Sequence, residues 1–198
     1  MPDGVGAYVL TDAVIEARRQ YPELQLQIIA MPRNFSLSKR EVDFAISVSR
    51  PRTGRVKVRK ISDYKLHLYA SESYLDQHRA IRNTSDLKHH TGVGYIPELL
   101  HDKQLDYIPL IDPDFSLKVS STSVHVQLQA ILKGAGIGIV HDFMAARYPQ
   151  LQRVLPKRIS FTRCFWMSVH EDYANVDRIR CAMDLTVREM KNSLIGVA

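Results

Sequence analysis

The chain has 198 residues, 45% of them hydrophobic, which is enough apolar material for one large domain or two small lobes. Its 27 basic and 21 acidic residues give a formal net charge of +6. No window approaches the roughly 18 consecutive apolar residues of a membrane-spanning helix, and the N-terminus lacks the basic start and apolar run of a secretory signal. A cytoplasmic location is therefore expected.

The chain contains two cysteines, Cys164 and Cys181, which form no close pair. Its eight histidines do not cluster at metal-ligand spacing. We therefore expect no disulfide framework, no metal site and no cofactor.

The first part of the chain alternates helical and strand patterns. An apolar stripe at helical spacing predicts a helix that Pro22 ends, and its members are Leu10, Ala13, Val14, Ala17 and Tyr21. Leu24, Leu26 and Ile28 then alternate with glutamines, which predicts a strand. After a short helical turn near residues 36–40, the apolar run at 43–48 predicts a buried strand of a parallel sheet. This order favours a wound α/β domain.

A basic stretch follows. Arg55, Lys57 and Arg59 alternate with Val56 and Val58, which predicts a strand with one solvated face. No helix-turn-helix and no set of stacking aromatic residues accompanies it, so direct DNA binding by this chain is not favoured.

The second part of the chain contains further helix and strand patterns, interrupted by an unassigned stretch at residues 97–114. The predicted strands are residues 66–70, 90–96, 117–119 and 161–170, and the predicted helices are a Ser71-capped helix, 143–147 and 176–190.

The segment from Ser120 to Val140 is the most informative one. Serines and a threonine precede a helical apolar pattern, Gly134 stands where a helix ends, and a buried strand follows. A helix N-terminus lined with hydroxyls is suited to a carboxylate or phosphate, although the hydroxyls also serve as ordinary helix caps. The glycines follow a helix and precede a strand, which is the reverse of a dinucleotide-binding loop.

Seven segments occur in order along nearly the whole chain. They are Asp3-Gly-Val-Gly, Gln20-Tyr-Pro-Glu-Leu-Gln-Leu, Arg40-Glu-Val-Asp-Phe-Ala-Ile, Leu68-Tyr-Ala-Ser-Glu-Ser-Tyr-Leu, Ser121-Thr-Ser, Ala130-Ile-Leu-Lys-Gly-Ala-Gly-Ile-Gly-Ile-Val, and Trp166-Met-Ser-Val-His-Glu-Asp with Arg178-Ile-Arg. Together they make the chain resemble the effector-binding domain of LysR-type transcriptional regulators.

The resemblance implies a fold like the type 2 periplasmic binding proteins. In that α/β fold, two wound lobes are joined by two crossover strands and hold a small molecule. The first lobe would comprise residues 1–70 and 165–198, and the second lobe residues 71–164. The effector would bias the hinge or the packing of subunits in a homodimer or higher homo-oligomer, and DNA would be bound only through a separate domain.

The resemblance also implies two segments that this chain lacks. Family members carry an N-terminal helix-turn-helix domain, and their effector domain begins with a strand just ahead of the position of Asp3. Without that strand the first sheet would contain a gap, and the chain is therefore expected to be a fragment or to have a misassigned start.

Carried over position by position, the resemblance implies effector-binding residues and no catalytic ones. The candidates are Asp3, Val5, Arg33, Ser49, Arg50, Tyr95, Ser121, Thr122, Ser123 and His141. Two arginines opposite a Ser/Thr cap would suit a small anion or carboxylate. Each candidate also has an ordinary role, as a helix cap, a solvated side chain or a core residue.

Two other classes of function are alternatives to this one. A stand-alone solute-binding protein of periplasmic type shares the fold but needs export. An enzyme is not favoured, because the sequence contains no Gly-x-Ser-x-Gly elbow, no His-Glu-x-x-His and no phosphate loop.

Overall fold

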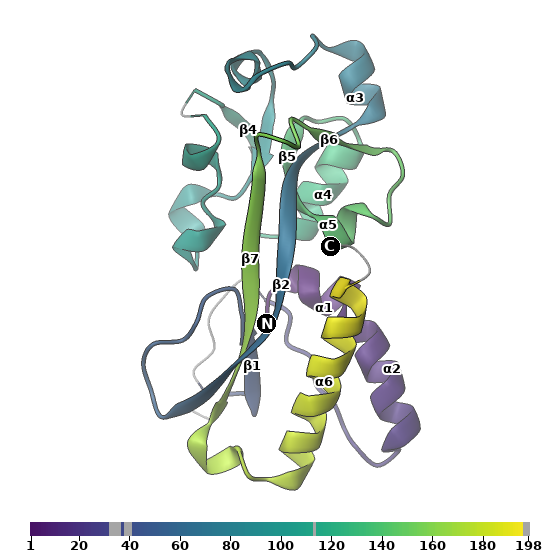
Figure 1. The fold of residues 1–198 in the computed structure, drawn as a ribbon, viewed down its shortest axis with the longest axis vertical. Coiled ribbons are helices and arrows are strands. Elements are labelled where there is room, and N and C mark those ends of the chain that lie inside the picture. The colour runs from purple at the N-terminus through teal and green to yellow at the C-terminus, as the bar shows by residue number, and fades with distance from the viewer. Residues whose placement is uncertain (32–36, 38–40, 113, 196–198) are drawn as a thin grey trace. The chain divides into compact units, whose positions relative to one another are not determined.

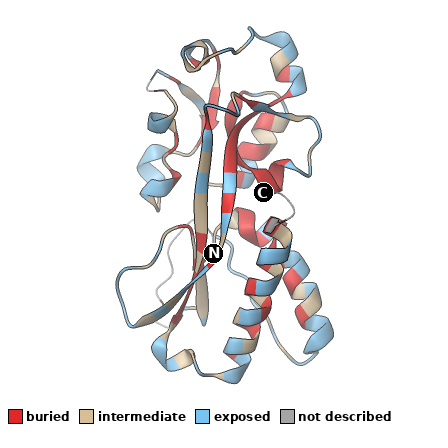
Figure 2. Cartoon of the chain, in the orientation of Figure 1, coloured by how far each residue is buried: buried red, intermediate tan, exposed pale blue. Residues whose placement is uncertain are grey.

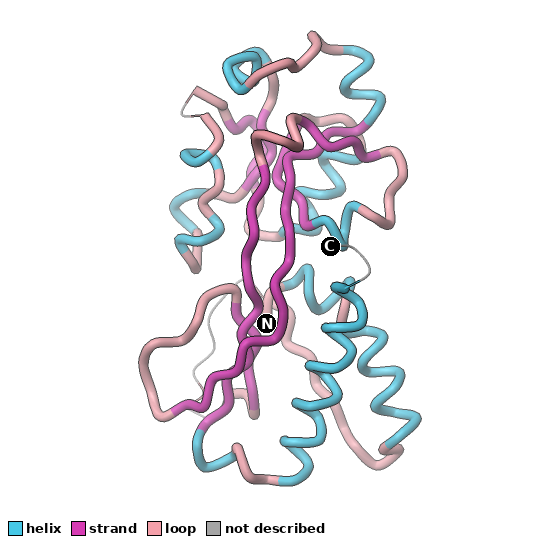
Figure 3. Tube along the Cα trace, in the orientation of Figure 1, coloured by secondary structure: helices cyan, strands magenta, loops and turns pink. Residues whose placement is uncertain are grey.

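A computed structural model describes residues 1–31, 37, 41–112 and 114–195 (Figure 1). It divides into two compact units. Unit 1 contains Met1–Tyr64 and Arg163–Ala198, and unit 2 contains Lys65–Thr162. Two long strands, β2 (Val56–Ser71) and β7 (Ser160–His170), are neighbours in the sheet, and each contributes residues to both units (Figure 3).

Unit 1 packs helices against a small sheet. Its further elements are α1 (Asp3–Tyr8), α2 (Leu10–Gln20), β1 (Phe44–Ser47), the 3-10 turn η5 (Glu171–Tyr173) and α6 (Asp177–Ile195). β1 pairs with β7 in antiparallel register, with Phe44 opposite Val169. Helices α2 and α6 pack on each other, and Ala17 of α2 and Ala182 of α6 are both buried.

Unit 2 is built around four strands in the order β2-β5-β3-β4, with β6 on the other edge of β2. Its elements are α3 (Glu72–Gln77), η1 (Thr84–His89), β3 (Gly92–Gly94), η2 (Pro97–Leu99), η3 (Lys103–Leu105), η4 (Ile108–Leu110), β4 (Leu117–Ser120), α4 (Val124–Leu132), β5 (Ile137–His141), α5 (Asp142–Ala145) and β6 (Leu151–Val154). β3 runs parallel to β4 and β5, whereas β2 is antiparallel to β5 and β6.

The core of unit 2 lies between α4 and this sheet. Every residue of β5 is buried (Figure 2). Leu128 and Ile131 of α4 are fully buried against it. None of the described helices combines the length and apolar character needed to span a membrane.

Most predicted elements are confirmed, since they depend on local signals. The helix that Pro22 ends is α2, Ser71 caps α3 by accepting a hydrogen bond from Tyr74 N at 3.3 Å, and Gly134 has φ +76° at the end of α4. Residues 97–114, which the sequence left unassigned, contain three 3-10 turns.

Several predictions are wrong. Residues 24–28 are extended but form no strand, because no ladder of hydrogen bonds joins them to another described segment. β1 pairs antiparallel rather than parallel, since an apolar run shows burial but not the direction of the neighbouring strand. Residues 56–59 and 66–70 belong to one strand, β2, and Arg55 precedes it, whereas β6 was not predicted. Residues 3–6, for which the sequence analysis predicts no regular element, lie in helix α1. The helical turn expected at residues 36–40 lies, except for Leu37, outside the described residues.

Candidate functional site

Three predicted site positions follow neighbouring strands of unit 2. Tyr95 comes directly after β3, Ser121 directly after β4, and His141 is the last residue of β5. Because these three strands are parallel, their carboxyl ends lie along one edge of the sheet. Ligands of wound α/β folds bind at such an edge, so the fold brings this group of candidates together.

The turn between β4 and α4 is fixed by main-chain hydrogen bonds. Ser121 N donates to Gly94 O at 3.0 Å, which ties the turn to the end of β3. Ser121 Oγ accepts from Ser123 N at 3.1 Å. Ser123 occupies the N-cap position of α4 but makes no side-chain cap hydrogen bond to the helix. The Ser121 hydroxyl therefore helps to order the turn.

The first turn of α4 favours a negative ligand. It carries no acidic side chain, so no protein carboxylate offsets the partial positive charge of the helix N-terminus. The three residues Ser121, Thr122 and Ser123 are half-buried. Their hydroxyls and main-chain N–H groups are of the kind that bind carboxylate or phosphate oxygens.

Gln127 supports this turn, and the sequence analysis missed it. Its side chain is 3% exposed, and its Nε2 donates to Ser121 O at 2.8 Å. Gln127 lies one turn into α4, on the face that also carries Val124 and Leu128. A glutamine among apolar residues on a buried helix face is the signal that would have found it.

A cavity of about 180 Å³ adjoins the same edge. Tyr95, Gln127 and Ile139 contribute to its lining, together with the 3-10 turns at residues 97–110. The walls are mainly apolar, with Leu105 and Tyr107 both buried. The unassigned stretch of the sequence therefore forms the wall of a cavity beside Tyr95.

His141 lies inside the fold rather than in solvent. It is 8% exposed, and its ring centroid is 5.1 Å from that of Phe143. The alternative that His141 is an ordinary solvated side chain is therefore wrong. Its position at the end of β5 is set by pairing with Leu66 of β2.

A buried carboxylate follows His141 directly. Asp142 is 3% exposed, and its Oδ1 lies 2.8 Å from His67 Nδ1 and accepts from Tyr69 OH at 2.9 Å. Arg153 Nη2 donates to Asp142 Oδ2 at 2.8 Å, and Arg153 Nε donates to Tyr69 OH at 3.0 Å. Burial, ahead of the neighbouring charges, raises the pKa of the Tyr69 phenol to about 12. We name these four residues the Asp142 cluster.

The remaining candidates belong to unit 1. Asp3 Oδ1 accepts from Gly4 N at 3.0 Å, and Val5 is 1% exposed, so the Val5 side chain belongs to the core. The exposed Arg50 guanidinium lies 5.6 Å from the ring centroid of Trp166. The main-chain oxygen of Ser49 accepts from Ser47 Oγ at 2.7 Å. Arg33 lies outside the described residues.

Within the described residues, no group of three or more His, Cys, Asp or Glu side chains has a geometry that could hold a metal ion. At the carboxyl edge of the unit 2 strands, the groups available to a ligand are hydroxyls, main-chain N–H donors and an apolar cavity. This combination suits the binding of an organic anion.

A protein family and several solved structures match this fold. The LysR substrate binding domain family matches residues 1–191. The chain therefore belongs to that family, the effector-binding domains of LysR-type transcriptional regulators, which have the type 2 periplasmic-binding-protein fold.

Among relatives, the HTH-type transcriptional regulator CrgA of Neisseria meningitidis serogroup B is 22% identical over 198 residues, covering 96% of this chain and 65% of CrgA. A glycine cleavage system transcriptional activator homolog of Haemophilus influenzae is 22% identical over 194 residues, covering 96% of this chain and 64% of that protein. The chain thus spans about 65% of the length of these relatives, which are transcriptional regulators rather than enzymes.

Solved structures show the same fold. The regulatory domain of CrgA from Neisseria meningitidis matches with a TM-score of 0.85 at 21% identity, covering 96% of this chain and 95% of that one. The regulatory domain of AphB from Vibrio vulnificus matches with a TM-score of 0.71 at 20% identity, covering 94% and 95%.

Proposed function

We propose that this domain senses a small anion or carboxylate as the effector of a LysR-type transcriptional regulator. The observation that carries the proposal is the start of α4, where half-buried hydroxyls of Ser121–Ser123 precede a helix turn without acidic residues. Tyr95 and His141 follow the neighbouring strands and would contact the rest of the ligand. The apolar cavity beside Tyr95 favours an organic acid over an inorganic anion.

Asp3, Ser49 and Arg50 of unit 1 stay predicted effector contacts, as does Arg33. Arg50 supports an anionic ligand because a guanidinium binds carboxylates in a bidentate way. We also propose that the domain forms a homodimer and acts on DNA through a separate DNA-binding domain, as the regulators it resembles do.

A thermal-shift screen against small carboxylates, aromatic acids, amino acids and sugar phosphates tests the effector class. A ligand at about 100 times its Kd stabilises the folded state by roughly 2.7 kcal/mol. We expect a rise in Tm with at least one carboxylate. A panel in which neither the carboxylates nor the phosphates raise the Tm would argue against a small anion as the effector.

Two variants locate the site once a carboxylate has been found. Ser121→Ala combined with Thr122→Val removes two hydroxyls from the start of α4, and we expect at least a tenfold loss of affinity by calorimetry. Ser85→Ala removes an exposed hydroxyl at η1 and serves as the matched control. Equal affinities in both variants would exclude the start of α4 as the binding site.

Light scattering on the purified chain tests the homodimer. We expect twice the chain mass at micromolar concentration. A monomer at all concentrations would contradict dimerisation through this domain.

A further inference from the structure

The cavity of about 180 Å³ in unit 2 lies against the side of the sheet that faces away from α4. A Cβ atom on Gly138 of β5 would lie 2.8 Å from Ile131 Cδ1 of α4, so this side of β5 faces the helix. Ile139, the next residue, points to the other side and lines the cavity. A Cβ on Gly94 of β3 would lie 3.0 Å from Cδ2 of Leu117, which lines the cavity as well. Strands β3, β4 and β5 therefore form the floor of the cavity.

The 3-10 turns at residues 97–110 form the opposite wall. Leu105 and Tyr107 are buried there, and the Tyr107 ring centroid is 5.3 Å from that of Phe161 of β7. Water inside such walls would find few hydrogen-bond partners, whereas an apolar protein cavity of roughly 150 Å³ can hold one benzene molecule. The volume and the walls therefore suit one six-membered ring.

At the carboxyl edge of the sheet, two residues that line the cavity hold the start of α4. Gly94 O accepts from Ser121 N at 3.0 Å, and Gln127 Nε2 donates to Ser121 O at 2.8 Å. The main chain of Ser121 is thus one hydrogen bond away from the lining of the cavity. One small organic acid can span this distance and reach both the cavity and the hydroxyls that precede α4.

The charges at the two ends orient such an acid. Among the described residues that line the cavity, Asp106 alone is charged. Its carboxylate disfavours a second negative group inside the cavity. The first turn of α4 carries no acidic side chain. An acid would therefore bind with its apolar part in the cavity and its carboxylate at the hydroxyls of Ser121–Ser123.

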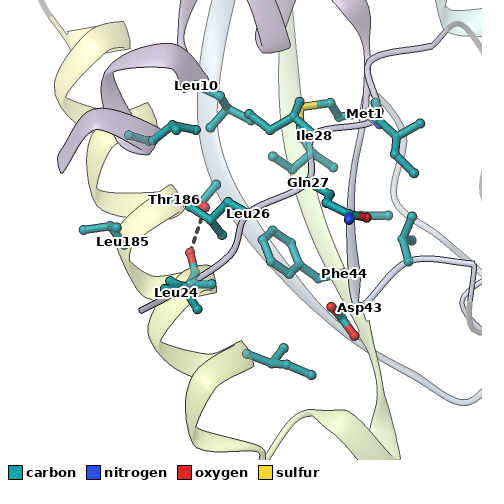
Figure 4. A pocket seen from close by; sticks show the side chains of 18 of the residues that line it. Met1, Leu10, Leu24, Leu26, Gln27, Ile28, Asp43, Phe44, Leu185 and Thr186 are labelled. Carbon is teal, nitrogen blue, oxygen red and sulfur yellow. Dashed lines mark hydrogen bonds between the residues drawn. The ribbon is translucent and has the colours of Figure 1, made fainter. Parts of the chain in front are cut away.

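A larger groove, of about 370 Å³, lies within unit 1, and Leu26 and Phe44 are among the residues that line it (Figure 4). None of the described residues that line this groove is a predicted effector contact. The unit 2 cavity differs, because Tyr95 is a predicted contact and two other lining residues bond Ser121. The groove therefore offers a control position outside the candidate site.

We propose that the unit 2 cavity binds the apolar part of the effector, and that this part has about the size of one six-membered ring. The effector is then a carboxylic acid with a single ring or with a branched chain of similar size. This inference rests on the proposed function, because it places the carboxylate at the start of α4. A second fused ring exceeds the cavity.

A series of acids tests the size of the cavity in the native chain by calorimetry. The acids are acetate, butyrate, benzoate, cyclohexanecarboxylate and naphthoate. Burial of one CH₂ group raises affinity about fourfold, so both six-ring acids should bind roughly thirtyfold or more tightly than acetate. Naphthoate should bind more weakly than benzoate. Equal affinities for acetate and benzoate would overturn the proposal. A continued gain up to naphthoate would overturn it too, because an open apolar surface gives that result.

Two variants change the cavity in opposite directions. Leu100→Trp fills it and should weaken benzoate about tenfold while the affinity for acetate stays the same. Leu105→Ala enlarges it and should shift the preference toward naphthoate about tenfold. A general loss of folding cannot produce both results. Leu26→Trp in the unit 1 groove is the matched control, since Leu26 and Leu100 are both half-buried, and it should change neither affinity.

Benzyl alcohol, a neutral compound with one ring, separates this inference from the proposed function. Ser121→Ala with Thr122→Val should weaken benzoate but not benzyl alcohol, whereas Leu100→Trp should weaken both. Binding of benzyl alcohol that Leu100→Trp abolishes, without binding of any acid, would support the cavity and contradict the proposed function. If the Ser121 and Thr122 variant weakens benzoate and Leu100→Trp does not, the cavity is excluded and the proposed function stands. No binding of any compound would overturn both.

Discussion

Nδ1 of His67 lies 2.8 Å from Oδ1 of Asp142, and both side chains are almost fully buried. The two residues are 75 positions apart in the chain. Asp142 also accepts hydrogen bonds from Tyr69 and Arg153, so one carboxylate joins β2, α5 and β6. Loss of the Asp142 carboxylate is therefore expected to destabilise unit 2.

Asp142→Ala should lower the free energy of unfolding by about 3 kcal/mol, because it leaves two buried polar side chains and one partly exposed arginine without their acceptor. Asp184→Ala is the matched control. Asp184 bonds Arg59 at the same distance, 2.8 Å, but both side chains are at least 50% exposed, so its loss should cost less than about 1 kcal/mol. Urea unfolding followed by circular dichroism measures both. Similar losses for the two variants would show that burial does not strengthen the Asp142 cluster.

Trp166 is the only tryptophan of the chain, so the fluorescence of the protein reports on the contact between its indole and Arg50. Arg50→Ala removes the guanidinium 5.6 Å from the indole centroid, so Trp166 emission should move to longer wavelength as water replaces the side chain. Stability should fall by less than about 1 kcal/mol, as expected for an exposed cation–π pair. Arg50→Lys keeps a cation and should give a smaller shift. An emission spectrum of Arg50→Ala that matches the native one would argue against this contact in solution.

His90 predicts a pH dependence. Burial, and after it the charge of His78, lowers the pKa of His90 below its usual 6.5. The unfolded state then binds more protons than the folded state between that lowered pKa and about 6.5, so stability rises with pH in this window and levels off above it. His90→Gln should reduce the rise in unfolding free energy between about pH 5 and 6.5. The variant His89→Gln, at the exposed neighbour, should retain most of it, because burial and the charge of His78 lower the pKa of His90 more than the charge of His89 does. An unchanged slope in His90→Gln would contradict the assignment.

Gly138 and Gly134 should respond differently to substitution. A Cβ on Gly138 would lie 2.5 Å from Val93 O and 2.8 Å from Ile131 Cδ1, so Gly138→Ala should cost about 2 kcal/mol or more through a clash with the main chain of β3. Gly134 has φ +76° and only ordinary contacts around its Cβ position. Gly134→Asn should therefore cost less than about 1 kcal/mol. Thermal denaturation measures the two Tm values, and a larger loss for Gly134→Asn would contradict the packing argument.

The elements that the sequence predicts correctly are those whose ends are marked by nearby residues. Pro22 ends α2, Ser71 caps α3, and Gly134 follows α4 because caps and backbone conformations depend on neighbours a few residues away. Strand pairing depends on distant partners. The alternation at residues 24–28 is that of a strand, but no described segment supplies the hydrogen bonds that would make it one.

The same distinction between local and distant partners applies to the residues of the candidate site. The hydroxyls of Ser121–Ser123 could be predicted because they precede a recognisable helix. Gln127 could have been found from its place on an apolar helix face, although the sequence does not show that its partner is Ser121 O. The Asp142 cluster could not be predicted, since its members come from strands far apart in the sequence. The cavity beside Tyr95 was equally hidden, because its wall consists of 3-10 turns that have no regular periodicity.

Unit 2 is formed by one chain segment and unit 1 by two, and this difference sets the order in which the units can fold during synthesis. Unit 2 is one continuous stretch, Lys65–Thr162, and is complete as soon as that stretch has left the ribosome. Unit 1 needs α6, which is synthesised last and covers the apolar face of α2. Helices α1 and α2 therefore remain without the cover of α6 while unit 2 folds. A nascent chain stalled after residue 162 should contain a protease-resistant unit 2 and a protease-sensitive N-terminus.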